Sequence, residues 1–136
     1  MNVENFFIDT NILIYFVKDS TGKAELIDTI LLNNSENYIS TQVANEFCNV
    51  ALKKLNFSTE ELIFLLENFA QFFNIYTVNI STIKKALKIK EKYAYSYYDS
   101  VIIASALQTN CSTLYTEDMH HGQIIDNRLT IINPFI

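Results

Sequence analysis

The chain has 136 residues, of which 49% are hydrophobic and 18% charged, and its formal net charge is −5. This length suits one domain with a hydrophobic core, and the composition excludes an intrinsically disordered chain. The negative charge argues against a broad basic surface for duplex DNA or membranes, although a cluster of cation-binding carboxylates would lower the net charge by itself. With only 2 glycines and 1 proline, long linkers are not expected, and we predict a single domain over residues 1–136.

The location of the protein in the cell is predicted from three features of the sequence. No run approaches the roughly 18 apolar residues of a membrane-spanning helix, and the first residues lack the pattern of a secretion signal. Cys48 and Cys111 both fall in apolar segments, where buried free thiols of a reducing compartment are typical. We therefore expect a cytoplasmic protein.

Strands and helices are predicted to alternate along almost the whole chain. The predicted strands cover residues 6–9, 37–40, 75–79, 112–116 and 129–133. The predicted helices cover residues 21–33, 41–55, 58–73, 81–94 and 97–110. Such alternation is typical of an α/β fold, in which a parallel sheet, here of about five short strands, is flanked by helices.

A carboxylate, Asp9, lies inside the apolar run FFIDTNILIYF. A charged group in an apolar segment is costly unless it is paired, hydrogen-bonded or bound to a metal. Asp9 ends the first predicted strand, and Asp118 closely follows the strand over 112–116. Because ligand sites of parallel sheets lie outside the carboxyl ends of the strands, both acids are expected at one such crevice.

Two further acids are predicted to face the same edge of the sheet. Glu46 shares its helix face with Val43, Phe47 and Val50, so it points inward or to the margin of that face. Asp99 falls in the first turn of an apolar helix. Taken alone, Asp99 and Asp118 also fit ordinary roles as helix-capping or turn residues; with Asp9 and Glu46, they predict one shared site.

Several carboxylates in one crevice repel each other unless a cation neutralises them. Ligand sets made only of oxygen atoms suit hard cations such as Mg²⁺ or Mn²⁺, and neither the histidines nor the cysteines have the spacing of a zinc site. A carboxylate-bound Mg²⁺ suits hydrolysis of phosphodiesters. The absence of a glycine-rich phosphate loop argues against a nucleotide kinase or a dehydrogenase.

Four segments in order, FIDTNILIY, STQVANEF, YYDSVIIASAL and LYTEDMHHGQ with the following LTIINPF, resemble the motifs of the PIN-domain family. The resemblance is closest to the VapC-like toxin ribonucleases of type II toxin–antitoxin systems. It implies a three-layer PIN-like fold, RNA cleavage that depends on Mg²⁺ (or Mn²⁺), and a cognate antitoxin as partner.

The resemblance also implies roles for particular residues. Asp9, Asp99 and Asp118 would be metal ligands, and Glu46 would join them as a catalytic acid. Asn11 and Thr116 would support these acids. Because Glu117 adjoins Asp118, the motif alone does not decide which of the two faces the metal; we expect Asp118 to do so, with Glu117 turned outward.

Two other functions stay open at this point: a non-catalytic PIN-like module that binds RNA or protein, and a metal-dependent DNase. His120, His121 and Arg128 are candidates for contacts with substrate phosphate, but the two histidines equally fit ordinary loop residues. The lysines between residues 84 and 92 fit a solvated helix face.

The helix predicted over 58–73 is more apolar than one buried face requires. A stripe suited to burial is formed by Leu62, Leu65, Leu66, Phe69 and Phe73. Ile63, Phe64 and Phe72 extend the apolar surface beyond that stripe. Exposed patches of this kind usually mark an interface, so we predict a two-fold homodimer.

Overall fold

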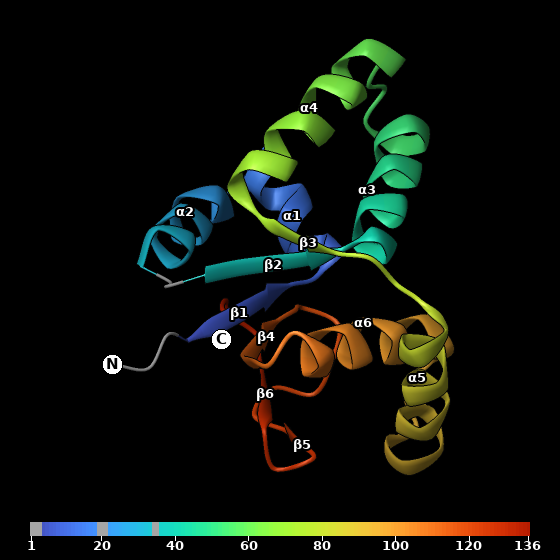
Figure 1. Ribbon diagram of the computed structural model, residues 1–136. Coiled ribbons are helices and arrows are strands. Elements are labelled where there is room, and N and C mark those ends of the chain that lie inside the picture. The colour runs from blue at the N-terminus through green and yellow to red at the C-terminus, as the bar shows by residue number, and fades with distance from the viewer. Residues whose placement is uncertain (1–3, 19–21, 34–35) are drawn as a thin grey trace.

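The computed structural model describes residues 4–18, 22–33 and 36–136, and has a central six-stranded sheet in the order β3-β2-β1-β4-β6-β5 (Figure 1). The strands are β1 (Asn5–Ile8), β2 (Glu36–Ser40), β3 (Asn74–Tyr76), β4 (Cys111–Tyr115), β5 (Ile124–Ile125) and β6 (Leu129–Ile132). The helices are α1 (Thr10–Val17), α2 (Lys23–Asn33), α3 (Thr41–Lys54), α4 (Thr59–Phe72), α5 (Ile80–Tyr93) and α6 (Tyr97–Gln108).

The pairing of the strands confirms the predicted α/β class. β3, β2, β1, β4 and β6 pair in parallel, in agreement with the expected sheet of about five strands. β5 adds a short antiparallel edge strand on β6. This strand was not predicted, because an element of two residues carries no readable alternation of apolar and polar positions.

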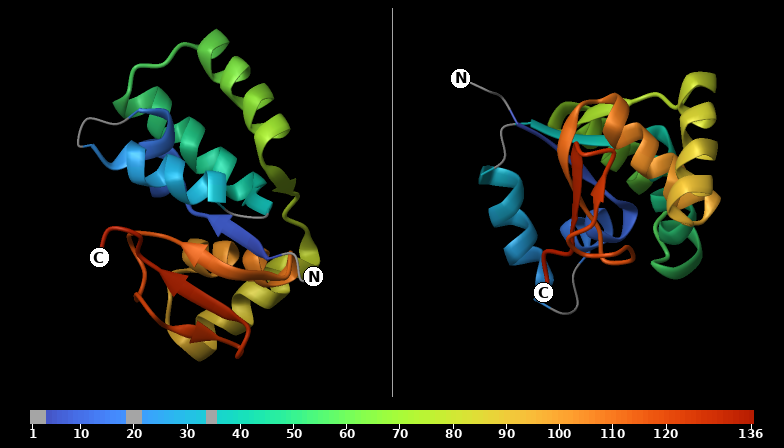
Figure 2. Two further views of the ribbon diagram at one scale, coloured as in Figure 1. Left: turned by 90° about the vertical axis from the view of Figure 1, so that its left-hand side faces the viewer. Right: turned by 90° about the horizontal axis from the view of Figure 1, so that it is seen from below.

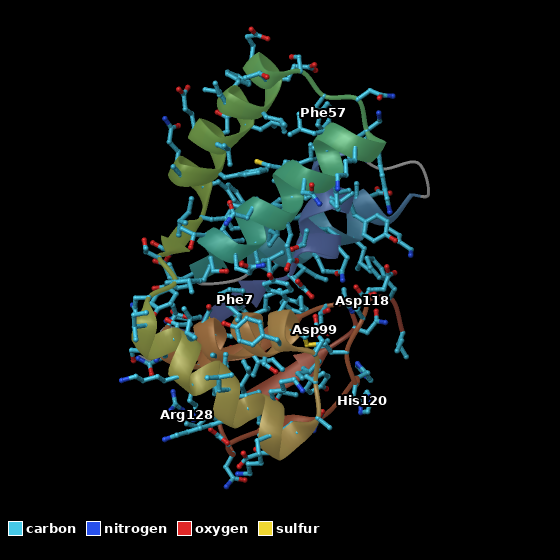
Figure 3. The ribbon with its side chains drawn as sticks, turned by 90° about the vertical axis from the view of Figure 1, so that its right-hand side faces the viewer. Phe7, Phe57, Asp99, Asp118, His120 and Arg128 are labelled. Carbon is cyan, nitrogen blue, oxygen red and sulfur yellow. The ribbon has the colours of Figure 1, made fainter. Side chains whose placement is uncertain are left out.

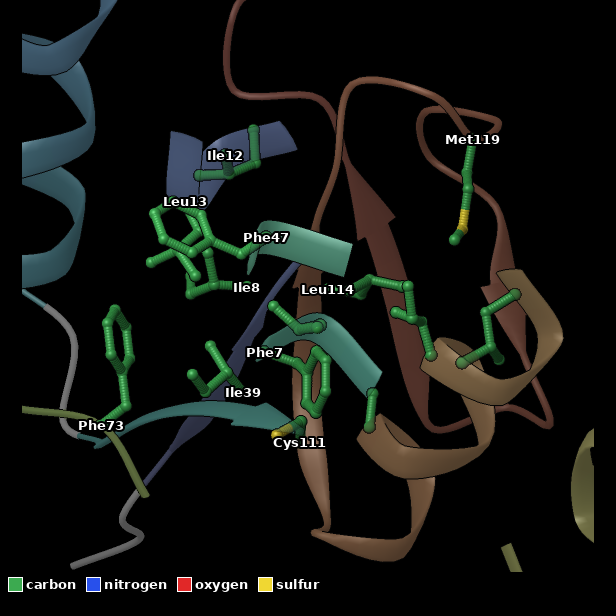
Figure 4. Packing of buried hydrophobic residues seen from close by; sticks show 14 of the residues in the cluster. Phe7, Ile8, Ile12, Leu13, Ile39, Phe47, Phe73, Cys111, Leu114 and Met119 are labelled. Carbon is green, nitrogen blue, oxygen red and sulfur yellow. The ribbon is translucent and has the colours of Figure 1, made fainter. Parts of the chain in front are cut away.

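Helices cover both faces of the sheet in three layers. Figure 2 shows α1–α4 on one side of the sheet and α5 with α6 on the other. The core between these layers centres on β1, where Phe7 and Ile8 are both fully buried. Ile39, Phe47 and Leu114 pack around them from neighbouring elements (Figure 4). Because β1 lies at the middle of a parallel sheet, it is apolar on both faces.

One helix, α1, was not predicted. β1 ends at Ile8, one residue before the predicted end, and Asp9 caps the N-terminus of α1. The run TNILIYFV is apolar on almost every position and contains β-branched residues, so its helical period is hidden in the sequence. The chain therefore turns directly from strand to helix at the carboxylate. Within the described segments, no helix has the length and apolarity needed to cross a membrane.

Candidate active site

A pocket of about 390 Å³ gathers four carboxylates at the carboxyl ends of β1 and β4. Asp9, Glu46, Asp99 and Asp118 all line it. They come from the β1–α1 junction, from α3, from the first turn of α6 and from the loop after β4, respectively. Figure 3 shows Asp99 and Asp118 on this side of the molecule. The structure thus brings together the acids that were expected to share one site.

Asp9 is the most deeply placed of these acids, with 3% of its surface exposed. Its Oδ1 accepts a hydrogen bond of 2.7 Å from the backbone N–H of Thr10, and its Oδ2 accepts one of 2.7 Å from the hydroxyl of Thr116. Burial raises the pKa of Asp9 to about 7, against the effect of these two bonds. The carboxylates of Glu46 and Asp99 contribute to this rise as smaller causes.

Glu46 is held in place by two side chains. The hydroxyl of Thr10 donates to Oε2 at 2.8 Å, and Nε2 of Gln42 donates to Oε1 at 2.9 Å. α3 starts immediately after β2, because the Ser40 hydroxyl accepts from the N–H of Val43 and caps the helix. This short connection places the second turn of α3, with Glu46, at the mouth of the crevice.

Asp99 lies in the first turn of α6, where Ser96 caps the helix by accepting a 3.2 Å hydrogen bond from the Asp99 N–H. Its carboxylate is half-buried. Burial raises the pKa of Asp99, the interaction with Ser96 opposes this, and the nearby carboxylates of Asp118 and Glu46 raise it again. Asp99 can therefore lie in the first turn of α6 and line the shared pocket at the same time.

Asn11 connects α1 to the loop after β4. Its Nδ2 donates a 2.7 Å hydrogen bond to Oδ2 of Asp118, and its Oδ1 accepts one of 3.2 Å from the N–H of Glu117. The N–H of Asp118 in turn donates to the Thr116 hydroxyl at 3.2 Å. Asn11 thus holds the exposed carboxylate of Asp118, and Thr116 holds its backbone.

Glu117 points away from the pocket. Its carboxylate forms an ion pair of 2.7 Å with Lys23 and accepts a 3.0 Å hydrogen bond from the hydroxyl of Tyr15. The hydrogen bond from Lys23 holds the pKa of Glu117 below its usual range. This arrangement agrees with the expectation that Asp118, and not Glu117, faces the site.

Arg128 lies far from the acids. Its guanidinium donates to the carbonyl of Leu107 at 2.8 Å and to Oδ1 of Asn110, so it caps the end of α6 opposite Asp99 (Figure 3). The β5–β6 hairpin, which no sequence pattern revealed, carries it there. The geometry therefore gives no support to a contact between Arg128 and substrate at this pocket.

The two histidines are exposed and lie outside the pocket lining. The N–H of His120 donates to the hydroxyl of Tyr95, and the two rings meet edge to face at 5.8 Å. Nδ1 of His121 accepts a 2.9 Å hydrogen bond from the N–H of Asn133. His120 is closer to the acids than Arg128 is (Figure 3).

Thr10 and Lys54 are among the pocket residues that were not predicted from the sequence. Thr10 links Glu46 to the β1–α1 junction, and its place beside Asp9 was the available signal. Lys54 also lines the pocket. It follows Glu46 and Val50 at intervals of four residues on α3, so helical spacing alone could have placed it on the same face.

The donor atoms of the pocket suit a hard cation. The carboxylates, the Asn11 amide and the Thr10 hydroxyl offer oxygen atoms of the kind that Mg²⁺ and Mn²⁺ prefer as ligands. Across the described residues, however, no three acidic, histidine or cysteine side chains are close enough to bind a metal as they stand. Both carboxylate oxygens of Asp9 and of Glu46 accept hydrogen bonds from the protein. The four acids therefore share a pocket, but their oxygens do not converge on one point.

Comparisons with known proteins agree with this fold. The family model of the PIN domain matches residues 6–124. A toxin–antitoxin complex from Klebsiella pneumoniae superposes with a TM-score of 0.71 at 20% identity, covering 94% of this chain and 96% of that one. The sarcin–ricin loop cleaving toxin VapC20 of Mycobacterium tuberculosis gives 0.68 at 12% identity, with 83% and 89% covered. VapBC2 from Rickettsia felis, bound to a fragment of promoter DNA, gives 0.67 at 19%, with 95% and 99% covered. No curated protein matches the sequence.

Proposed function

Because the chain belongs to the PIN domain family, we propose that it is a metal-dependent endoribonuclease and the toxin of a toxin–antitoxin pair. The observation that carries this proposal is the convergence of Asp9, Glu46, Asp99 and Asp118 on one pocket. The similar structures support it: one is a toxin named for cleaving the sarcin–ricin loop, and others are toxin–antitoxin complexes.

Asp9, Asp99 and Asp118 would hold Mg²⁺ or Mn²⁺. Such an ion, when bound, polarises the scissile phosphate and lowers the pKa of the attacking water. Glu46, fixed by Thr10 and Gln42, would orient that water. Asn11 and Thr116 would hold the carboxylates of Asp118 and Asp9 in position. No nucleophilic serine or cysteine is needed for this hydrolysis.

The antitoxin would cover the pocket with a helix or an extended tail, and a basic side chain of the partner would pair with the acids. Expression of the toxin alone should then arrest growth, and co-expression of the antitoxin encoded beside it should restore growth. Harmless expression of the wild type at high level would contradict the toxin assignment.

Two alternatives differ from this proposal in what they require of the pocket. A non-catalytic module that binds RNA or protein has no need of four mutually repelling carboxylates, so their gathering argues against it. A metal-dependent DNase would use the same acids. RNA is favoured over DNA by the named activity of the similar toxin from M. tuberculosis.

The decisive experiment measures cleavage of labelled RNA by the purified protein with Mg²⁺, with Mn²⁺ and with EDTA. Cleavage should occur only with a divalent metal, and Asp9→Asn should abolish it while circular dichroism shows an intact fold. Single-stranded DNA of the same sequence should stay uncut. RNA cleavage that survives both EDTA and Asp9→Asn would exclude this mechanism, and preferential cutting of DNA would favour the DNase.

A further inference from the structure

The basic residues of this acidic protein are concentrated on one helix. Of the 10 lysines and arginines in the chain, α5 contributes Lys84, Lys85, Lys88, Lys90 and Lys92. Lys84, Lys88 and Lys92 follow each other at intervals of four residues, a spacing at which like charges destabilise a helix. Lys92 is compensated by Asp126, but an anion bound across Lys84 and Lys88 would relieve the repulsion between these two.

A pocket of about 410 Å³ lies on this helix, between α5 and the end of α6. Its lining consists of Ser81, Lys84, Lys85, Lys88 and Gln108. No carboxylate is among these residues, in contrast to the acidic pocket at the other end of α6. The lining side chains are therefore three ammonium groups, one hydroxyl and one amide.

Gln108 is oriented so that its donor group faces Ser81. Its Oε1 accepts hydrogen bonds from the hydroxyls of Tyr76 and Thr82. The bond from Thr82 is 2.8 Å long, and Thr82 is fully buried. Its Nε2 donates to Oγ of Ser81 at 3.1 Å, which leaves the Ser81 O–H available as a donor. The side of the pocket formed by Gln108 and Ser81 thus presents hydrogen-bond donors, which suit an anion.

The lysines of α5 differ in how far their charge is compensated. Lys85 pairs with Asp126 at 2.7 Å and Lys92 with the same carboxylate at 3.5 Å. Over the parts of the chain that the structure describes, Lys84 and Lys88 have no ion-pair partner. Two uncompensated positive charges therefore remain at the pocket.

We propose that this basic pocket binds backbone phosphates of the RNA strand beside the cleavage site. The inference rests on the proposed ribonuclease function. Without its metal the acidic pocket repels phosphates, and the net charge of the chain is −5, so a separate basic surface would help to attract RNA. The lysines of α5 are the concentrated source of such attraction.

The position of α5 favours RNA that also enters the acidic pocket. α5 leads through residues 94–96 into α6, whose first turn carries Asp99. Figure 3 shows α5 on the side of the molecule that presents Asp99 and Asp118. Asp99 and Gln108 are nine residues apart on α6, or about 14 Å along the helix axis. A short single strand can span this distance.

Binding tests the proposal directly. The affinity of the protein for a labelled single-stranded RNA of about 15 nucleotides is measured by fluorescence anisotropy in EDTA over a series of salt concentrations. Lys84→Glu with Lys88→Glu should weaken binding roughly tenfold. The slope of log affinity against log salt should fall in magnitude by about 1.4, because each phosphate that the protein no longer neutralises lowers it by about 0.7.

The matched control is Lys90→Glu, which makes the same change of charge on the same helix. Lys90 is two residues from Lys88, about 200° around the helix axis, and is absent from the pocket lining. Lys88→Glu should weaken RNA binding more than Lys90→Glu. Equal effects would show a general loss of charge and overturn the site. A loss of duplex DNA binding with RNA binding unchanged would also overturn it.

Cleavage separates this inference from the proposed function. The double variant should cut a long RNA more slowly at low substrate concentration, through a raised KM, but should cut an RNA of about six nucleotides like the wild type. If both proteins cut the long RNA equally, the basic pocket fails and the ribonuclease stands. If neither cuts any RNA but binding still depends on Lys84 and Lys88, the ribonuclease fails and the RNA site stands.

Discussion

The hydroxyl of Thr116, just after β4, donates a hydrogen bond of 2.7 Å to the buried Oδ2 of Asp9, just after β1. The two residues are 107 positions apart in the chain, and neighbouring parallel strands bring them together. This bond stabilises the charged form of a carboxylate whose pKa burial has raised to about 7. Asp9 is therefore a buried acid of the candidate site that is held by hydrogen bonds and has a raised pKa.

Replacement of Thr116 by valine should remove this support without changing the volume of the side chain. A buried carboxylate that loses a hydrogen bond should destabilise the protein by about 2 kcal/mol near pH 8. The pKa of Asp9 should rise, which moves the acidic limb of the activity profile to higher pH. Thr113→Val on β4 is the control, and the prediction is wrong if both variants have equal melting temperatures and pH profiles.

The stability of the metal-free protein should fall as the pH rises from 5 to 8. Burial raises the pKa of Asp9 from 3.8 to about 7, so the folded state binds a proton that the unfolded state has released in this range. The contribution is present below pH 4 and is lost through pH 7, with a total on the order of 4 kcal/mol. Urea unfolding in EDTA at several pH values measures it.

Asp9→Asn should flatten this dependence on pH and should raise the melting temperature at pH 8 in the absence of metal, because it removes a buried charge and its repulsion from Glu46 and Asp99. Glu117→Gln is the control, since the pKa of Glu117 is lowered and the residue stays ionised throughout the range. If the free energy of unfolding of Asp9→Asn depends on pH as strongly as that of the wild type, the titrating group is not Asp9.

Asp118 and Glu117 provide a matched pair of neighbouring acids. Asp118→Asn should reduce RNA cleavage at least a hundredfold, because Asp118 lines the acidic pocket. Glu117→Gln should leave cleavage unchanged and lower stability by less than about 1 kcal/mol, since its ion pair with Lys23 is partly exposed. Single-turnover cleavage of both variants decides the point; the reverse ranking would mean that Glu117 enters the site.

Self-association through α4 remains a prediction. Leu62, Phe69 and Phe73 are buried as expected, whereas Ile63 and Phe64 are 53% and 63% exposed. Two apolar grooves, of about 380 and 200 Å³, lie beside α4 and share Phe16 and Phe72. We expect a dimer mass by light scattering at micromolar concentration.

Phe64→Glu should return a folded monomer if the interface is on this helix. Phe72→Glu is the harsher variant, because the Phe72 ring also stacks on Phe16 at 5.5 Å and its loss disturbs the monomer. A monomer mass for the wild type would contradict the dimer. The exposed apolar face of α4 would then be expected to bind a different protein.

The α/β class and the four candidate acids could be predicted from local patterns in the sequence. The period of apolar residues placed α3, α4, α5 and α6 within two residues of their observed ends. Asp9 was recognisable because a charge in a buried strand needs a partner. Glu46 was recognisable because it breaks an apolar helix face. These signals are local, so each can be found within a single segment of the chain.

The way in which these acids are held depends on contacts between distant segments of the chain. The bonds of Asp9 to Thr116 and of Asn11 to Asp118 join residues more than 100 positions apart, and no local pattern encodes such pairs. The same holds for the ion pair that turns Glu117 toward Lys23, and for the hairpin that carries Arg128 to the far end of α6. Local sequence fixes what a segment prefers, whereas partners over long separations depend on which strands become neighbours.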